Sequence, residues 1–258
     1  DLIVTSGVVT QSAALTIPGT TTISNTGRDV TVSDSSNSFT GAVSISGGAI
    51  DLENDRATLL GATTATSNFA LDSNGAVTQN ADLSITGTTT ITAGSGNDIT
   101  LDDTANTFTD AVGIVSGNNV TLDADTAIIL AASTITGNLE VELSSAGTIT
   151  DSGVITVGGT TSLDAGGVGD TVSDITLDDS HTFTGDVTIL QGGNVTINDN
   201  GSALGLGAPV TISTVGGDLT LTSGGAFEFD QAITLDTGEN LDLIVTSGVV
   251  TQSAALTI

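Results

Sequence analysis

The hydrophobic residues of this chain occur in short apolar–x–apolar triplets, nearly always with Thr or Ser in the middle. Residues 15–17, 30–32 and 99–101 are examples. Alternation over such a short span indicates a strand with one buried face. Turn residues, mainly Gly, Asn, Asp and Ser, lie between the triplets, and no stretch carries a helical period. The pattern therefore predicts an all-β protein.

The chain also repeats itself at two levels. Its opening sequence, DLIVTSGVVTQSAALTI, returns letter for letter as residues 242–258. Residues 1–241 therefore form one full tandem repeat, and residues 242–258 begin the next copy. Inside this period, inner segments start near residues 1, 69, 139 and 219.

The three long inner segments carry the same motifs in the same order. A turn glycine precedes VTQ in the first two segments and TITD in the third, and a Thr-rich stretch follows. The next motif, DVTVSD or DITLDD, begins at Asp29, Asp98 and Asp174. Last comes NSFTG, NTFTD or HTFTG, which aligns Phe39, Phe108 and Phe183. We expect these phenylalanines to point into the core at equivalent corners, about three coils apart.

Many short strands could form a sandwich, a barrel or a solenoid. A sandwich or barrel closes on itself, whereas each coil of a solenoid needs a neighbour on both sides. The return of the opening sequence therefore predicts a right-handed parallel β-helix, with about ten coils of roughly 24 residues in each tandem repeat. No segment has the pattern of a polar cap, so we expect adjacent copies of the repeat to continue the solenoid end to end.

The patterns GxVTQxAxLxI, TTTI, DITLDD and NTFTGxVxI extend over the whole chain. In these patterns the chain resembles the repetitive shafts of filamentous-haemagglutinin-type adhesins and related large repetitive bacterial exoproteins. The resemblance implies secretion across an outer membrane and a role in surface display. We therefore expect a structural repeat of an extracellular filament, stalk or adhesin shaft at the cell surface, providing reach and rigidity.

The strong negative charge of the chain limits the kinds of molecule that it can bind. The chain has 30 Asp and Glu residues against two Lys and Arg residues, a formal net charge of −28. Such a surface repels nucleic acid. No apolar run is long enough to span a membrane, so we expect no membrane insertion of this segment. Divalent cations could instead bridge acidic fibres, which predicts lateral fibre–fibre contacts in their presence.

The single histidine, His181, stands where the sister segments have Asn37 and Asn106. A position that alternates between Asn and His indicates a turn site that needs a short polar group. One histidine without a partner ligand does not make a metal site or a catalytic centre. The sequence therefore predicts no catalytic residue.

Two pairs of adjacent carboxylates, Asp102–Asp103 and Asp178–Asp179, raise the alternative of a β-helix polysaccharide-active enzyme. Neighbouring residues of a strand point to opposite faces, so adjacency does not create a catalytic dyad. An acidic sugar would also need cationic groups to bind it, and the chain has no Lys and no Arg beyond residue 56. We therefore expect that the protein is not an enzyme.

Calcium is the stronger alternative. The Gly-rich stretches that end at Asp98 and Asp170 approach the GGxGxDxUx nonapeptide of Ca²⁺-binding β-rolls, although both depart from it in detail. The candidate metal ligands are Asp98, Asp102, Asp103, Asp170, Asp178 and Asp179. This alternative predicts a Ca²⁺-responsive solenoid that binds or bundles, with no other cofactor.

Overall fold

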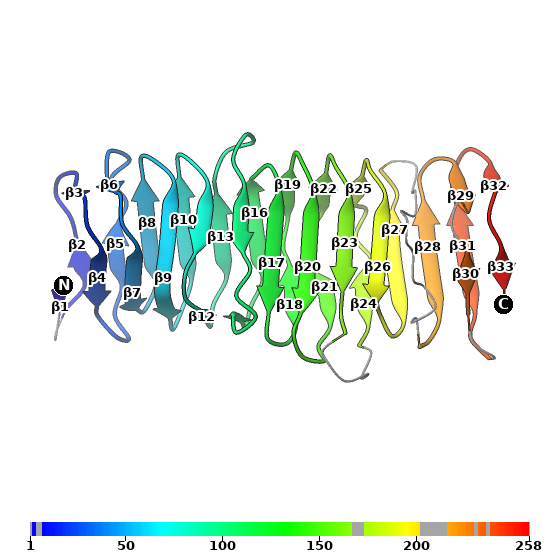
Figure 1. Cartoon of the computed structure of the whole chain (residues 1–258), viewed down its shortest axis with the longest axis horizontal. Coiled ribbons are helices and arrows are strands. Elements are labelled where there is room, and N and C mark those ends of the chain that lie inside the picture. Colours follow the sequence, from blue (N-terminus) through cyan, green and yellow to red (C-terminus); the bar gives the residue numbers. More distant parts are fainter. Residues whose placement is uncertain are drawn as a thin grey trace. The chain divides into compact units, whose positions relative to one another are not determined.

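The computed structural model describes residues 2–3, 7–166, 173–201, 216–229, 232–235 and 238–257. The chain divides into two compact units, Asp1–Asp125 (unit 1) and Thr126–Ile258 (unit 2). Each unit consists of short parallel strands joined by turns, and the described residues contain no helix (Figure 1). The predicted all-β fold, a parallel β-solenoid of about ten turns, is confirmed.

Unit 1 contains two main sheets. Its strands are β1 (Leu2–Ile3), β2 (Val9–Thr10), β3 (Thr16–Ile17), β4 (Thr21–Ser24), β5 (Val30–Val32), β6 (Ser38–Phe39), β7 (Val43–Gly47), β8 (Ile50–Asn54), β9 (Thr58–Ala65), β10 (Phe69–Ser73), β11 (Val77–Gln79), β12 (Leu83–Ile85), β13 (Thr89–Thr92), β14 (Ile99–Leu101), β15 (Thr107–Phe108), β16 (Val112–Ser116) and β17 (Val120–Ala124). The first sheet has the order β1-β4-β7-β9-β11-β14-β17, and the second has β2-β5-β8-β10-β13-β16. Short strands such as β3 and β6 lie where the chain passes from one sheet to the other.

Unit 2 follows the same plan. Its strands are β18 (Ile128–Leu130), β19 (Ser133–Ile135), β20 (Leu139–Leu143), β21 (Ile149–Asp151), β22 (Ile155–Val157), β23 (Thr161–Asp164), β24 (Ile175–Leu177), β25 (Thr182–Phe183), β26 (Val187–Gln191), β27 (Val195–Asp199), β28 (Leu219–Ser223), β29 (Phe227–Phe229), β30 (Ile233–Thr234), β31 (Leu241–Val245), β32 (Val250–Gln252) and β33 (Leu256–Thr257). One sheet has the order β18-β21-β24-β27-β28-β31, and others contain β20-β23-β26 and β19-β22-β25.

The apolar triplets form strands because alternate side chains enter a core between the sheets. In β5, Val30 and Val32 are buried while Thr31 faces outward. Parallel pairing then stacks each apolar position on its equivalent one turn later. The turns differ in length, because Val30 pairs with Ile50, whereas the longer turn that starts at Ile149 ends at its partner Ile175. The predicted coil of roughly 24 residues lies between these two turn lengths.

The inner repeat does not contain a whole number of turns. Starting from Val30 in the second sheet of unit 1, three turns lead through Ile50 and Phe69 to Thr89. Ile99 is the counterpart of Val30 in the second inner segment, yet it lies in β14 of the first sheet. The step from Val30 to Ile99 therefore spans three and a half turns.

This half turn corrects the expectation for the phenylalanines. Phe39, Phe108 and Phe183 are all buried, as predicted. However, β6 lies in the chain between the second and the first sheet of unit 1, whereas β15 lies between the first and the second. Phe39 and Phe108 therefore occupy opposite edges rather than equivalent corners. Figure 1 shows β6 at the upper edge of unit 1 and β12, the partner of β15, at the lower edge.

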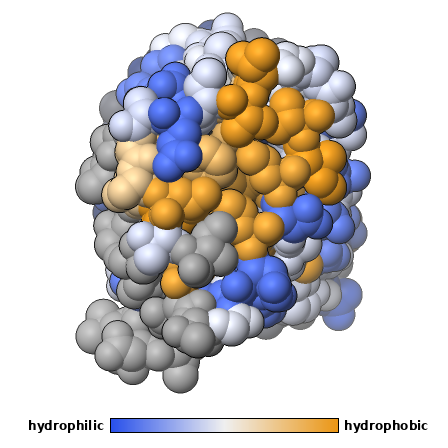
Figure 2. All heavy atoms as spheres, turned by 90° about the vertical axis from the view of Figure 1, so that its right-hand side faces the viewer, coloured by the Kyte–Doolittle hydropathy of each residue, from blue (hydrophilic) through white to orange (hydrophobic). Residues whose placement is uncertain are grey.

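The two copies of the repeated sequence form strands at matching positions but differ in exposure. Val9 in β2 packs against Val30 of the next coil and is 7% exposed, whereas its copy Val250 in β32 is 50% exposed. Val8 and its copy Val249 are both exposed, because these residues face outward in either copy. Figure 2 shows the resulting apolar surface over the last coil of unit 2.

The close stacking of turns gives a first prediction. A Cβ atom added at Gly41 would lie 2.6 Å from the carbonyl carbon of Gly19 in the preceding coil, whereas a Cβ added at Gly19 would meet nothing within 4 Å. We expect Gly41→Ala to lower the free energy of unfolding by about 1–3 kcal/mol through overpacking. Gly19→Ala serves as the matched control, with a change below about 0.5 kcal/mol. Urea unfolding followed by circular dichroism measures both, and equal losses would contradict the packing described here.

Candidate functional site

The first candidate metal ligand, Asp98, links two coils through hydrogen bonds. It immediately precedes β14, and its Oδ1 accepts hydrogen bonds from the Asn119 backbone N–H at 3.0 Å and from the Asn118 and Asn119 side-chain amides at 2.8 and 3.0 Å. The Asn119 backbone N–H, followed by the Asn118 side chain, lowers the pKa of the Asp98 carboxyl below its usual range. Asp98 therefore joins its coil to the next one.

Other residues that precede a strand make the same link. Asp29 Oδ1 accepts a hydrogen bond from Ala49 N–H at 2.9 Å, one turn later. In unit 2 the links form a ladder, because the residue whose backbone N–H donates in one link accepts, through its side chain, the hydrogen bond of the next link. Asn194 N–H donates to Asp174 at 2.8 Å, Asp218 N–H to Asn194 at 2.9 Å, and Asn240 N–H to Asp218 at 2.9 Å. The recurrent order of the motifs thus places a coil-to-coil acceptor before each of these strands.

The remaining candidate ligands do not converge on a common point. Asp103 closes a local turn by accepting a hydrogen bond from Ala105 N–H at 3.0 Å, and Asp102 is exposed beside it. Asp178 and Asp179 are also exposed, and Asp170 lies outside the described residues. Within the described part of the chain, no group of three or more His, Cys, Asp or Glu residues has an arrangement that could hold a metal ion.

A pair of amides, of which Asn37 is buried and Gln11 is partly exposed, links the VTQ motif to the NSFTG motif. Gln11 Nε2 donates to Asn37 Oδ1 at 2.8 Å, and Asn37 Nδ2 donates back to Gln11 Oε1 at 2.9 Å. Asn37 Oδ1 also accepts a hydrogen bond from Leu15 N–H at 2.9 Å, and its Nδ2 donates to the Val32 carbonyl at 2.7 Å. Asn37 is fully buried, so these bonds satisfy polar groups that water cannot reach.

The second inner segment repeats this arrangement. Gln79 Nε2 donates to Asn106 Oδ1 at 2.8 Å, and Asn106 Nδ2 donates back to Gln79 Oε1 at 3.0 Å. Leu83 N–H donates to Asn106 Oδ1 at 2.9 Å, as Leu15 N–H does to Asn37. The two motifs are therefore the halves of one recurrent structural element.

In the third segment, both partners change together to Asp151 and His181. Ile155 N–H, the equivalent of Leu83 N–H, donates to His181 Nδ1 at 3.0 Å. His181 Nε2 lies 3.4 Å from Asp151 Oδ2, and both side chains are buried. The carboxylate of Asp151 also accepts hydrogen bonds from the backbone N–H groups of Asp178 at 3.0 Å and Asp179 at 3.3 Å.

Burial shifts the pKa of both members of this pair toward their neutral forms. Desolvation lowers the pKa of His181, while the charges of Asp151, Asp179, Asp199 and Asp178 oppose that shift. Desolvation likewise raises the pKa of Asp151, against the hydrogen bond from Asp178 N–H and the charge of His181. The site is therefore a buried ionizable pair inside the wall of the solenoid.

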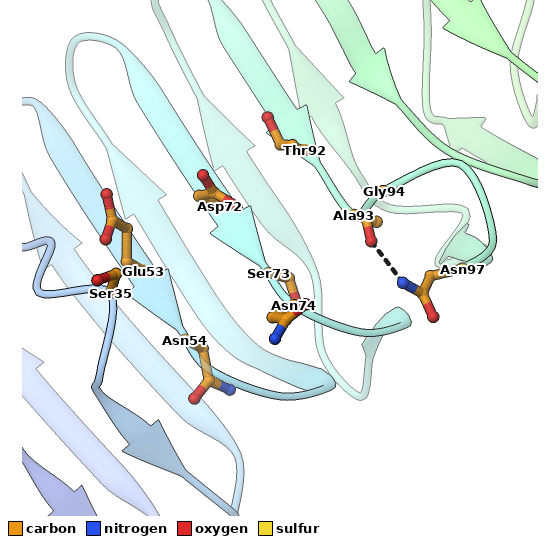
Figure 3. A pocket seen from close by; sticks show the side chains of 10 residues that line it. All are labelled: Ser35, Glu53, Asn54, Asp72, Ser73, Asn74, Thr92, Ala93, Gly94 and Asn97. Atoms are coloured by element: carbon orange, nitrogen blue, oxygen red, sulfur yellow. Dashed lines mark hydrogen bonds between the residues drawn. The ribbon is translucent and has the colours of Figure 1, made fainter.

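An open polar groove of about 320 Å³ crosses several coils of unit 1 (Figure 3). Glu53 and Asp72, two of its lining residues, are Cα partners on neighbouring strands. Desolvation first, and then the charges of Asp72, Asp51 and Asp34, raise the pKa of Glu53. The described residues that line the groove are all neutral or acidic.

The family comparison matches three consecutive stretches of the chain. The family model described as Repeats of unknown function (DUF5649) matches residues 1–46, 47–115 and 117–190. The chain belongs to this repeat family. Neither curated proteins nor solved structures give a match.

Each match to the repeat family contains one of these polar pairs. Gln11 and Asn37 lie in the first matched stretch, Gln79 and Asn106 in the second, and the pair of Asp151 and His181 in the third. The second matched stretch, residues 47–115, is about as long as the first inner segment identified from the sequence, but it begins at a different phase. None of the described residues forms a helix long and apolar enough to span a membrane.

Sequence reasoning missed the glutamine of the VTQ motif as the partner of the asparagine. The only signal was the joint change in the third repeat, where TITD replaces VTQ and HTFTG replaces the Asn-containing motif. The assignment of His181 to the position of Asn37 and Asn106 agrees with the geometry, because all three accept the equivalent backbone N–H group. In addition, the His181 side chain is buried and paired with Asp151, which the interpretation as a turn site did not include.

The amide pair gives a second prediction, in the form of a double-mutant cycle. Asn106→Ala leaves Leu83 N–H and the Gln79 side chain without their buried partner, so we expect a loss of about 1–3 kcal/mol in the free energy of unfolding. Gln79→Ala should cost less once Asn106 is already absent, with a coupling energy of at least about 0.5 kcal/mol. Urea unfolding of the two single variants and the double variant measures this coupling. Strictly additive losses would show that the two amides do not act as a pair.

Proposed function

We propose that the chain is a structural repeat of a secreted bacterial filament, stalk or adhesin shaft, with a mechanical role in reach, rigidity and surface display. Its polar contacts support this role, because the buried amides and many of the aspartates link one coil to the next. The net charge of −28 argues against nucleic acid as a partner. On this proposal, the protein is extracellular and has no catalytic activity.

The repeated sequence carries the proposal. Residues 242–258 restate residues 1–17, and their strands β31, β32 and β33 pair in parallel with β28, β29 and β30 as one further turn. Val9 is buried against Val30 of the next coil, and Val250, the same position in the second copy, lies on the apolar surface of the last described coil.

Unit 1 indicates what would cover this surface. There, β2 pairs with β5, β3 pairs with β6, and Gln11 bonds to Asn37. An adjacent copy of the repeat would place the equivalents of β5 and β6 on β32 and β33, and the equivalent of Asn37 on Gln252. Continuation through the covalent chain would then give one uninterrupted ladder, with neighbouring copies as end-to-end partners.

A chain of two periods tests the proposal. Residues 1–258 followed by residues 18–258 should form one rod that is longer by about 50 Å, at about 4.8 Å per turn, with an unchanged cross-section. Small-angle scattering measures both dimensions. Two separate beads, or a closed barrel, would contradict the filament.

Two matched variants of the same two-period chain test whether the copies pack on each other at the junction, where residues 242–258 meet the following copy. Val250→Asp would bury an unpaired charge between copies and should destabilise the junction by roughly 3–5 kcal/mol, whereas Val249→Asp faces outward and should have little effect. In the one-period chain, where Val250 is half exposed, the two variants should behave alike.

A specific observation favours a second candidate, a Ca²⁺-responsive module. Glu53 and Asp72 are stacked on adjacent coils, and so are Glu142 and Asp164. Desolvation raises the pKa of Asp164, and repulsion from Asp72 contributes to the raised pKa of Glu53. Loosely held divalent cations would relieve this repulsion and could bridge neighbouring fibres.

The stacked carboxylates give a pH-dependent and salt-dependent prediction. Because the folded-state pKa of Glu53 is raised, its ionisation disfavours the folded state as pH rises through that pKa. Glu53→Gln should therefore stabilise unit 1 at pH 7 by less than about 1 kcal/mol at low salt. The gain should vanish below about pH 4, and high salt should reduce only the part that comes from repulsion between carboxylates. Urea unfolding measures this gain, with the exposed Asp82→Asn as control.

Chelation separates the two candidate functions. If Ca²⁺ only screens these carboxylates, millimolar Ca²⁺ should reduce the advantage of Glu53→Gln, and EDTA should leave the fold intact in a circular dichroism melt. Unfolding by EDTA would instead make the ion an integral part of the solenoid.

A further inference from the structure

The third repeat contains an ionizable pair, Asp151 and His181, at the place where the first two repeats have neutral amides. An amide pair has the same hydrogen-bonding capacity at every pH between 4 and 8, because neither Asn nor Gln titrates. Histidine is the side chain whose ordinary pKa, about 6.5, lies in the middle of this interval. The substitution therefore introduces a pH-dependent group into an otherwise pH-independent structural element.

The geometry fixes the state of His181 when the coil is closed. Ile155 N–H can only donate, and it lies 3.0 Å from His181 Nδ1, so Nδ1 must be unprotonated. The remaining hydrogen of a neutral imidazole is then on Nε2, which faces Asp151 Oδ2 at 3.4 Å. A second proton on Nδ1 would place two hydrogens between His181 and Ile155. Protonation at Nδ1 is therefore incompatible with the bond that joins the two coils.

Several carboxylates surround His181, but they do not remove the clash between a proton on Nδ1 and the N–H group of Ile155. Asp151 approaches from β21, Asp178 and Asp179 follow β24, and Asp199 ends β27. Asp199 is itself fully buried and accepts a hydrogen bond from Phe183 N–H at 3.1 Å. These charges favour a protonated imidazole, but the desolvation of His181 outweighs them and lowers its pKa.

We propose that the ionizable pair makes the third repeat a pH-sensitive section of the solenoid, closed at neutral pH and opening between coils when mild acid protonates His181. The step is a proton transfer from hydronium in the solvent to Nδ1: an O–H bond breaks, an N–H bond forms, water is released, and the hydrogen bond from Ile155 N–H is lost. The inference goes beyond a purely mechanical shaft, because it gives one repeat a response that its sister repeats lack.

The direction of the effect follows from proton linkage. In the open coil, His181 has its ordinary pKa of about 6.5, and in the closed coil the pKa is lower. The open state therefore binds more protons below about pH 6.5, so the closed state is most stable above that pH and loses stability as pH falls. The equilibrium constant for opening should rise by up to about tenfold per pH unit in this interval.

Asp151 acts in the opposite direction. Its pKa is raised in the closed coil, so its protonation favours closure. If the first proton bound to Asp151 instead of His181, the bond from Ile155 N–H to His181 would remain intact. The behaviour of the Ile155 amide therefore distinguishes the two sites of protonation.

Amide hydrogen exchange, measured by NMR on the 258-residue chain between pH 7.5 and 5, tests the proposal. After correction for intrinsic exchange rates, the protection of Ile155 N–H should fall by up to about tenfold per pH unit below about pH 6.5. Leu83 N–H, which donates to Asn106 in the equivalent position, is the internal control and should keep its protection. Equal behaviour of the two amides across this pH range would overturn the proposal.

Two double variants exchange the pairs between repeats. Asp151→Gln with His181→Asn restores an amide pair and should make the protection of Ile155 N–H independent of pH. Gln79→Asp with Asn106→His should transfer the pH dependence to Leu83 N–H. Persistent pH dependence of Ile155 in the first variant would assign the effect to the surrounding carboxylates and refute a role for His181. If either variant fails to fold, the comparison of Ile155 with Leu83 in the unmodified chain still decides.

Discussion

Coil-to-coil registration of parallel strands is the constraint on which the other features of this protein depend. Each strand pairs with its equivalent one turn later, so every position stacks on a corresponding position, as Val30 does on Ile50. Apolar positions therefore build continuous columns, and a polar group turned inward must find its partner in its own or a neighbouring coil. The mutual bonds of Gln11 and Asn37 satisfy this requirement.

The same registration explains the positions of the acidic residues. An acceptor immediately before a strand lies beside the N–H group of the equivalent residue one turn later, as Asp98 lies beside Asn119. Aspartates at such positions strengthen the ladder, whereas carboxylates that stack face to face, such as Glu53 and Asp72, repel each other. A strongly acidic composition is therefore compatible with a stable solenoid when many of its carboxylates accept backbone hydrogen bonds.

The sequence predicted the strands and their stacking, because alternation at positions such as Val30 and Val32 reports burial directly. It did not reveal the half turn between Val30 and Ile99, because the length of a coil depends on how its turns close in space. The sequence also could not show that the candidate ligands lie apart. Asp98 and Asp103 accept hydrogen bonds from backbone N–H groups of different segments, so their carboxylates do not converge on one point. The only sequence signal that Asp151 is the partner of His181 was that the two motifs containing them, TITD and HTFTG, change together in the third segment.

The half-integral repeat has a consequence for any array built from steps like the one between Val30 and Ile99. Each step turns a motif to the opposite face, as Phe39 and Phe108 lie at opposite edges of unit 1. A bend caused by a bulky loop on one repeat would be reversed by the next, so curvature would cancel over every two repeats. A ligand or antibody that recognises one surface motif would accordingly decorate both sides of the array in alternation, at twice the axial spacing of the repeat on each side.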